Sequence, residues 1–276
     1  MQDEGGPLYS PAVVSELLTR HGLRADKSFG QNFLIDGNIL EIIVEAAAVG
    51  VEDTVLEIGP GLGVLTRALA EKAERVVSVE LDERLLPLLE ETTGYLSNVE
   101  IVAGDGLEYD MGQLPPESLL VANLPYNVGT PILLRALNSG RFKRIVVMVQ
   151  REVAERLSAA PGSGAYGSLS PIVAQYGSVT RVKNVPPSAF FPAPEVMSSV
   201  VRVEVDPDAR ADPELTEFIY TAFRHRRKTL KKNLLIAGYD KVRVAGALEA
   251  VELDPKVRAE AVGLEAFRAL WRQLEG

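Results

Sequence analysis

The sequence predicts an α/β fold in which a doubly wound, mostly parallel sheet is followed by a small helical domain. Short apolar runs typical of buried strands alternate with helical patterns over about the first 200 residues. From residue 213 onward, only helical patterns occur. Two acid–proline pairs, Asp206-Pro207 and Asp212-Pro213, mark the boundary. We therefore predict one domain over residues 1–205 and a second over residues 206–276.

The composition is that of an ordinary globular protein, with 46% hydrophobic and 24% charged residues among 276. No apolar run is as long as a membrane-spanning helix, and the first ten residues, MQDEGGPLYS, lack the basic and apolar regions of a signal peptide. We therefore expect a cytoplasmic protein without a membrane partner. The chain has no cysteine, which excludes disulfides and a thiolate nucleophile. With two histidines and no carboxylate motif near them, we expect no metal site.

The formal net charge is −9, but the charges are unevenly distributed. Residues 223–234 contain six basic side chains and no acidic one. A basic helix of this kind can bind phosphates even on an acidic protein, although it could also be a solvated charged face. The candidate RNA-binding residues are Arg224, Arg226, Arg227, Lys228, Lys231 and Lys232.

Two helices are expected before the first strand of the sheet. Ser10 can cap the first helix, with Pro11 at its first position. Asp36 can cap the second helix, which we expect to end at Gly50. Between them, residues 27–34 mix polar and aromatic side chains without a helical or strand period, so we expect a specific loop there.

A glycine-rich turn between the first strand of the predicted sheet, residues 54–58, and the next helix is a candidate nucleotide site. Its glycines, Gly59, Gly61 and Gly63, let the backbone approach a ligand closely. The third glycine comes one residue earlier than in the dinucleotide fingerprint G-x-G-x-x-G. Glu57 would repel a pyrophosphate but could serve a cationic or amino-bearing ligand. The alternative is a strand–helix turn without a ligand.

Acidic residues follow the next two predicted strands. Residues 75–79 lead to Glu80, which is placed to hydrogen-bond ribose hydroxyls; Asp82 could take this role or cap the next helix. Residues 99–103 are followed by Asp105, which could accept from the amine of an adenine or belong to an ordinary turn. Ligands bind at this edge of open α/β sheets. An acidic edge suits a ligand with an ammonium group, ribose hydroxyls and an adenine amine, which describes S-adenosylmethionine better than NAD.

A fourth strand, residues 118–122, leads into Asn123-Leu124-Pro125-Tyr126. The amine of a base is a poor nucleophile because its lone pair is delocalised into the ring. The Asn123 side-chain oxygen and a backbone carbonyl of Leu124 or Pro125 could accept its two hydrogens and so make the nitrogen pyramidal. Tyr126 offers a face on which a flipped base can stack, although it could instead pack in the core.

The remaining elements complete the sheet and the second domain. We expect a helix that ends at residue 137, a strand over residues 144–149 and a helix over residues 150–158. Residues 179–185 and 199–205 are expected to form an antiparallel pair, because no long helix separates them. Helices are then expected over residues 215–226, 229–237, 241–248 and 264–274.

Several of these motifs resemble those of one enzyme family. The glycine-rich segment Glu57-x-Gly59-x-Gly61-x-Gly63 is similar to motif I of S-adenosylmethionine-dependent methyltransferases, and residues 123–126 resemble motif IV of N6-adenine methyltransferases. Three further segments are similar to signatures of the small-subunit ribosomal RNA adenine dimethyltransferases (the KsgA/RsmA family): KSFGQNFL at 27–34, FFPAPEVMS at 190–198 and FRHRRKTL at 223–230. The resemblance extends from residue 27 to the C-terminus. It implies a seven-stranded, Rossmann-like methyltransferase sheet with a helical RNA-binding domain.

The resemblance also implies a role for each matching residue. The residues implied to bind S-adenosyl-L-methionine are Asn32, Leu34, Glu57, Gly59, Gly61, Glu80, Asp105 and Asn123. The residues implied in catalysis are Asn123, Leu124, Pro125, Tyr126 and Phe190. Of these, Tyr126 and Phe190 would sandwich the target adenine.

The implied reaction is N6,N6-dimethylation of two adjacent adenosines in the 3′-terminal hairpin loop of small-subunit (16S) rRNA, without a metal or a covalent intermediate. The implied partner is this rRNA within a pre-assembled small ribosomal subunit, together with a monomeric protein and a role in subunit assembly. Alternatives are a large-subunit rRNA adenine N6-methyltransferase of the resistance type, and a non-catalytic ribosome-assembly or transcription factor on the same fold. The segment Arg226-Arg227-Lys228-Thr229-Leu230 favours the small-subunit branch. Leu124, in place of a proline, argues against a DNA methyltransferase.

Overall fold

The computed structural model describes residues 7–26, 30–209 and 211–275. The chain forms two compact units, and each is built from two stretches of the chain. The first unit consists of Met1–Ala154 and Thr180–Val205, and the second consists of Glu155–Val179 and Asp206–Gly276. The predicted boundary at residue 205 is the position at which the chain leaves the first unit for the last time. The second unit, however, also includes residues 155–179, which we had assigned to the first domain.

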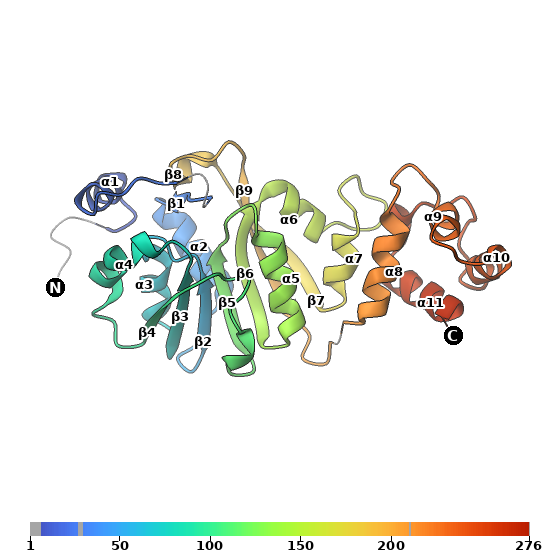
Figure 1. Ribbon diagram of the computed structural model, residues 1–276, viewed down its shortest axis with the longest axis horizontal. Coiled ribbons are helices and arrows are strands. Elements are labelled where there is room, and N and C mark those ends of the chain that lie inside the picture. Colours follow the sequence, from blue (N-terminus) through green and yellow to red (C-terminus); the bar gives the residue numbers. More distant parts are fainter. Residues whose placement is uncertain (1–6, 27–29, 210, 276) are drawn as a thin grey trace. The chain divides into compact units, whose positions relative to one another are not determined.

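A seven-stranded sheet forms the centre of the first unit, with the strand order β4-β3-β2-β5-β6-β9-β7 (Figure 1). Its strands are β2 (Thr54–Ile58), β3 (Arg75–Glu80), β4 (Val99–Ala103), β5 (Ser118–Asn123), β6 (Phe142–Gln150), β7 (Gly177–Val185) and β9 (Ser198–Val205). Strands β2 to β6 pair in parallel, whereas β9 runs antiparallel to β6. Strand β7 lies next to β9, as predicted. The doubly wound α/β fold is therefore confirmed.

The chain order reverses at β2, and this reversal determines where a ligand can bind. Strand β2 pairs with β3 on one side and with β5 on the other. From β2 the chain builds outward through β3 and β4, and it then returns to add β5 and β6 on the opposite side. At such a switch point the connections after the two neighbouring strands diverge and leave a crevice. The carboxyl ends of β2 and β5 meet at this crevice.

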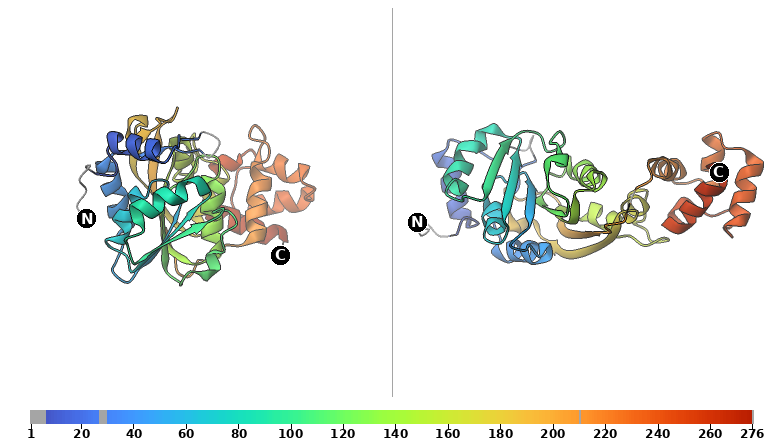
Figure 2. Two further views of the ribbon diagram at one scale, coloured as in Figure 1. Left: turned by 60° about the vertical axis from the view of Figure 1, so that its left-hand side comes forward. Right: turned by 90° about the horizontal axis from the view of Figure 1, so that it is seen from below.

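Helices cover both faces of the sheet because alternate strand residues point to opposite sides. The helices of this unit are α1 (Pro11–Arg20), α2 (Gly37–Ala47), α3 (Val64–Ala70), α4 (Leu86–Thr93) and α5 (Gly129–Ser139). Helix α6 (Arg151–Leu157) begins in this unit and ends in the second. Alternate residues of β5 and β6, such as Val121 and Val146, share one apolar cluster with helices α1 to α4. Helix α5 packs on β6 from the other face (Figure 2). Short 3₁₀ turns occur at Glu83–Leu85, Met111–Gln113 and Pro187–Ala189.

The ends of α1 and α2 differ in how their free backbone groups are satisfied. Asp36 caps α2 as predicted, because its Oδ1 accepts from the backbone N–H groups of Asn38 (3.0 Å) and Ile39 (3.2 Å). Helix α2 ends at Ala47 and not at Gly50 as we predicted, because Ala48 takes the left-handed conformation, with φ at 44°. Ser10 occupies the cap position of α1, but its side chain makes no capping hydrogen bond.

The second unit is a bundle of short helices around an aromatic core. Its helices are α7 (Leu169–Ala174), α8 (Pro213–Phe223), α9 (Leu230–Ile236), α10 (Lys241–Ala250) and α11 (Leu264–Glu275), with a 3₁₀ turn at Ala259–Ala261. The ring of Phe267 contacts those of Phe218 and Phe223, and Tyr166 contacts Phe223. The Tyr166 hydroxyl donates to the Val262 carbonyl at 2.8 Å. Helix α7 was not predicted from the sequence.

The predicted basic helix is wrong. Helix α8 ends at Phe223 and α9 begins at Leu230, so residues 224–229 form the turn between two helices. Only Lys231 and Lys232 of the six basic residues lie on a helix. No helix in the described part of the chain is long and apolar enough to cross a membrane.

The two helix starts give a matched test of capping. We expect Asp36→Ala to lower the free energy of unfolding by about 1 kcal/mol, because two backbone N–H groups lose their acceptor. Ser10→Ala is the control, and it should cost clearly less because the serine makes no capping hydrogen bond. Urea denaturation followed by circular dichroism measures both values. Equal losses in the two variants would contradict this account of the helix ends.

Candidate active site

A cleft opens at the carboxyl ends of β2 and β5, where the strand order reverses. Its walls come from residues 30–34, the glycine turn, the end of β3 and residues 123–126. The lining contains every residue that the sequence assigned to the cofactor: Asn32, Leu34, Glu57, Gly59, Gly61, Glu80, Asp105 and Asn123. Of the residues assigned to catalysis, the same cleft contains Asn123, Leu124, Pro125 and Tyr126. The fold thus brings together segments that are about 90 residues apart in sequence.

The glycine turn requires glycine for two reasons. Gly59, Gly61 and Gly63 have φ angles of 73°, 59° and 81°, a left-handed conformation that strains other residues. A Cβ atom on Gly63 would lie 2.7 Å from Thr93, and a Cβ on Gly61 would lie 3.0 Å from the Phe33 ring. The turn therefore packs directly against its neighbours, and its backbone forms one wall of the cleft.

The carboxyl group of Glu57 is buried beneath this turn, with only 1% of the residue exposed. Its Oε2 accepts from the Thr66 hydroxyl at 2.6 Å and from the Ser78 hydroxyl at 2.8 Å. Burial raises the pKa of Glu57 to about 7, although the two hydroxyl hydrogen bonds oppose this shift. Glu57 thus joins β2 to the first turn of α3 and to β3. Sequence reasoning found Glu57 but not its two hydroxyl partners.

Glu80 lies at the end of β3 and is held at both oxygens. Its Oε2 accepts from the Gly61 N–H at 3.1 Å, and its Oε1 accepts from the Asp82 N–H at 2.8 Å. Burial raises the pKa of Glu80. Asp82, the alternative candidate for the ribose, instead caps the 3₁₀ turn at Glu83–Leu85 and lies outside the lining of the cleft. Asp105 is exposed at the cleft, and its Oδ1 accepts from the Leu107 N–H at 2.8 Å.

The Asn123 side chain is oriented by the N-terminal segment. Its Nδ2 donates to the Asn32 carbonyl at 3.0 Å, which leaves Oδ1 as an acceptor at the cleft. The Pro125 carbonyl accepts from the Val128 N–H at 3.2 Å within the turn. Of the two backbone carbonyls considered from the sequence, that of Pro125 therefore already has one partner within the turn.

Tyr126 is half-buried and fixed by a partner that sequence reasoning missed. Its hydroxyl lies 2.5 Å from Oγ of Ser198, a fully buried residue at the start of β9. Burial raises the pKa of Tyr126, so the phenol is neutral at physiological pH. Ser198 is the last residue of the segment 190–198 that we had singled out. A serine at the end of that segment, at the start of a strand, was the available signal for such a role.

The structure does not bring Phe190 into the cleft. Phe190 belongs to β8 (Phe190–Phe191), which pairs antiparallel with β1 (Phe33–Leu34). It lies opposite Leu34, is only 3% exposed and is absent from the cleft lining. The exposed aromatic residue of β8 is Phe191, at 39%. The predicted sandwich of a base between Tyr126 and Phe190 is therefore not preformed.

Part of the N-terminal signature falls outside the described residues, namely Lys27, Ser28 and Phe29. Its remaining residues, 30–34, all line the cleft. Within the residues that the structure describes, no group of three or more histidine, aspartate or glutamate side chains is arranged to hold a metal ion.

Comparison with known proteins identifies the family. Residues 22–266 match the family described as ribosomal RNA adenine dimethylase. The chain belongs to this family. A relative named ribosomal RNA small subunit methyltransferase A, from Deinococcus radiodurans, is 48% identical over 268 residues, which cover 97% of this chain and 91% of the relative. S-adenosylmethionine is the cofactor of this type of methyltransferase, and the acidic, glycine-walled cleft fits it.

Two solved transferase structures share the fold. A dimethyladenosine transferase from Plasmodium falciparum has a TM-score of 0.78 at 27% identity, over 88% of this chain and 97% of that chain. The 23S rRNA methyltransferase ErmE has a TM-score of 0.71 at 26% identity, over 89% of this chain and 100% of that chain. The predicted methyltransferase fold with a helical C-terminal part is confirmed.

Four of the six candidate basic residues lie on the turn between α8 and α9. Arg224, Arg226, Arg227 and Lys228 are exposed, and residues 225–228 line a shallow hollow. The Asn233 amide supports the turn from below, since its Nδ2 donates to the Ala222 carbonyl at 2.7 Å and to the His225 carbonyl at 3.3 Å. The turn therefore holds its cationic side chains on a fixed backbone.

The raised pKa of Glu57 predicts a pH effect on stability. Between its ordinary value of 4.5 and about 7, the folded state binds more protons at Glu57 than the unfolded state does. The contribution of Glu57 to the free energy of unfolding therefore falls as the pH rises through this range. Glu57→Gln removes this contribution while retaining an acceptor for Thr66 and Ser78. In urea unfolding, the free energy of unfolding of the variant should rise relative to that of the native protein by up to about 3 kcal/mol between pH 4.5 and pH 8. If the free energies of unfolding of the two proteins changed with pH in parallel, the raised pKa of Glu57 would be contradicted.

Proposed function

We propose that this protein is an S-adenosylmethionine-dependent adenine N6,N6-dimethyltransferase that acts on small-subunit ribosomal RNA. The observation that carries the proposal is the Asn123 amide, which is held by the Asn32 carbonyl so that its Oδ1 remains an acceptor at the cleft. The family match and the full-length relatives named ribosomal RNA small subunit methyltransferase A support the same reaction and the same RNA. The sequence signature at residues 226–230 also favours the small subunit.

The cleft offers a distinct contact for each part of the cofactor. Asn32 and Leu34 would lie at its methionine end, and the glycine turn would approach it through the backbone. Glu80 would accept from the ribose hydroxyls and Asp105 from the adenine amine. Glu57 supports this arrangement from beneath the turn rather than through a free carboxylate, because its Oε2 is already bonded to two hydroxyls.

The bound cofactor supplies an electrophilic methyl group, and the task of the protein is to make the adenine N6 nucleophilic. Asn123 Oδ1 and the Leu124 carbonyl would each accept a hydrogen bond from one N–H of the N6 amine. Two such acceptors favour a pyramidal nitrogen whose lone pair is no longer shared with the ring. Preorganised acceptors and correct positioning are sufficient for this step, and the N6 proton can leave to water after the transfer.

Tyr126 would stack on the flipped adenine, with its ring fixed by the hydroxyl contact to Ser198. Phe190 can provide the opposite face only if β8 moves, because its side chain is buried beside Leu34. The proposal therefore includes a rearrangement of β8 when RNA binds.

The proposed substrate is the pair of adjacent adenosines in the 3′-terminal hairpin loop of the small-subunit rRNA, within a pre-assembled subunit. Loop bases can be turned out of the RNA at modest cost. The exposed basic turn of residues 224–229 would contact phosphates of the subunit. We further propose that the protein acts as a monomer in the cytoplasm, and that binding to the immature subunit gives it a role in assembly.

Methyl transfer from labelled S-adenosylmethionine tests the proposed reaction. Small ribosomal subunits that lack the modification should acquire N6,N6-dimethyladenosine, whereas naked large-subunit RNA and DNA should not. Asn123→Ala should lower the rate at least about 100-fold, as loss of a preorganised polar group does in other active sites. Label in large-subunit RNA would instead indicate the resistance-type reaction. Subunit binding without label in any substrate would favour the non-catalytic assembly factor.

The basic turn gives a separate prediction about RNA binding. Replacing Arg226 and Arg227 together with glutamine should weaken binding to small subunits and reduce its dependence on salt, because fewer phosphate counterions are released. Cofactor binding should not change. Lys241→Gln, at an exposed position of α10 in the same unit, is the control. Binding assays at several salt concentrations measure the effect, and an unchanged salt dependence would remove the turn from the interface.

A further inference from the structure

The N-terminal wall of the cleft has little secondary structure of its own. Residues 30–34 are all in the lining, but only Phe33 and Leu34 belong to a strand, the two-residue β1. An irregular segment is ordered only where specific contacts offset its conformational entropy. The position of this wall therefore depends on the side chains that bind it to the rest of the unit.

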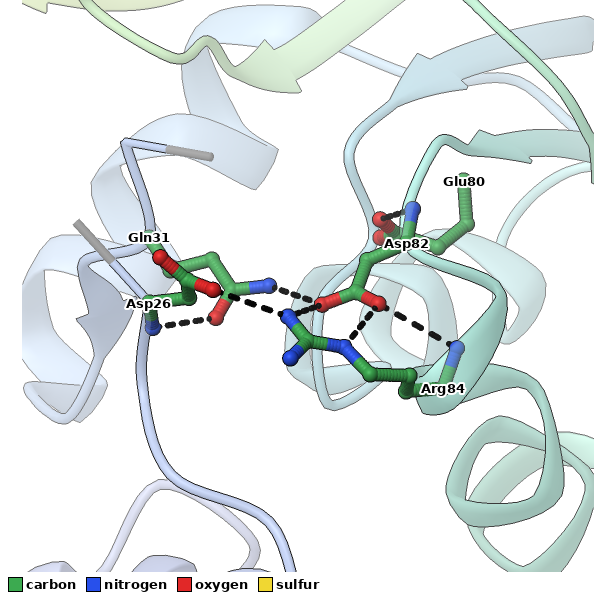
Figure 3. A network of polar contacts seen from close by, with 5 residues as sticks. All are labelled: Asp26, Gln31, Glu80, Asp82 and Arg84. Carbon is green, nitrogen blue, oxygen red and sulfur yellow. Dashed lines mark hydrogen bonds and ion pairs between the residues drawn. The ribbon is translucent and has the colours of Figure 1, made fainter. Parts of the chain in front are cut away.

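Gln31 makes two of these contacts (Figure 3). Its Oε1 accepts from the Asp26 N–H at 2.8 Å, which joins the wall to residue 26. Its Nε2 donates to Asp82 Oδ2 at 2.8 Å, which joins the segment to the residues just after β3. One side chain thus connects the wall both to residue 26 and to the residues after β3.

Arg84 completes the connection from the other side. Its Nε donates to Asp82 Oδ1 at 2.7 Å, and its Nη2 contacts Asp82 Oδ2 at 2.8 Å and Asp26 Oδ2 at 3.2 Å. Figure 3 shows Arg84 between the two carboxylates. Asp82 is only 4% exposed, and the contact with Arg84 is the main reason why the pKa of Asp82 is lowered. These hydrogen bonds are charge-assisted and partly shielded from water, so each is stronger than a neutral one.

The same aspartate leads into the cleft. The Asp82 N–H donates to Glu80 Oε1, and Glu80 Oε2 accepts from the N–H of Gly61 in the glycine turn. A continuous path of hydrogen bonds therefore runs from the N-terminal segment, through Asp82, to the acid and the glycine proposed to hold the cofactor.

We infer that Gln31, Asp82 and Arg84 are positioning residues for the cofactor: they hold the N-terminal segment in the conformation that lines the cleft. The inference rests on the proposed function of that cleft as the S-adenosylmethionine site. With the hydrogen bonds of Gln31, Asp82 and Arg84 intact, the wall is already ordered before the cofactor arrives. Without them, binding must also order the wall, and the affinity is reduced by the fraction of molecules in which the wall is in place.

The test is the affinity of the full-length protein for S-adenosylmethionine, measured by calorimetry. Gln31→Leu and Arg84→Met should each weaken binding by about tenfold, the effect of losing one charge-assisted contact. Because both act through Asp82, the double variant should lose less than the product of the two single losses. Arg84→Lys keeps the charge but not the forked geometry, and should recover part of the affinity.

Arg75→Met is the matched control. Arg75 pairs with Glu100 across β3 and β4, its side chain is 49% exposed against 51% for Arg84, and neither residue of that pair lines the cleft. Its affinity should equal that of the native protein. For Arg84→Met, the KM for S-adenosylmethionine should rise while kcat at saturating cofactor stays within about twofold, as expected when binding alone is affected.

The outcomes separate this inference from the proposed function. Native affinity in both Gln31→Leu and Arg84→Met would overturn the positioning role and leave the methyltransferase proposal intact. An equal loss in Arg75→Met would also overturn it, because the effect would then be one of general stability. Failure of the native protein itself to bind S-adenosylmethionine would remove the proposed cofactor site and, with it, the basis of the inference.

Discussion

The buried carboxyl group of Glu57 lies where three elements of the sheet unit meet. Through Thr66 and Ser78 it joins the end of β2 to the start of α3 and to β3. The glycine turn leads from β2 to α3, and three of its residues take the left-handed conformation. Burial raises the pKa of Glu57, which reflects the free-energy cost of burying its charged form. The protein thus has a carboxyl group that is costly to bury directly beneath its glycine turn.

The cleft above this carboxyl group is formed by several segments that are distant in the sequence, and no single motif forms it alone. The sheet supplies rigid strand ends, and Glu80 and Asn123 are each held by a backbone group from another segment: the Gly61 N–H in one case and the Asn32 carbonyl in the other. Polar side chains oriented in this way can meet a ligand without further rearrangement. The arrangement explains why a motif at residue 32 and a motif at residue 123 belong to one site.

Local pattern was sufficient to predict the doubly wound, mostly parallel sheet, the glycine turn and the acids at the strand ends, because apolar periodicity and turn chemistry are local properties. The sequence could not show that Phe190 faces the core or that Ser198 reaches Tyr126, since both depend on the pairing of β8 and β9 with distant strands. The basic segment was misread as a helix because its residues suit helices, whereas Asn233 holds the chain there in a turn. Helix α7 was missed because its six residues carry too short a pattern.

The chain crosses between the two units more than once, and this limits how the protein can be divided. Helix α7 comes before the last strands of the sheet, yet its apolar residues Ile172 and Val173 are buried within the unit that contains α8 and α11. A fragment cut after residue 205 would keep α7 but lose the helices that cover it. An exchange of the second unit between related proteins would therefore have to transfer residues 155–179 as well as residues 206–276, that is, two separate pieces of sequence.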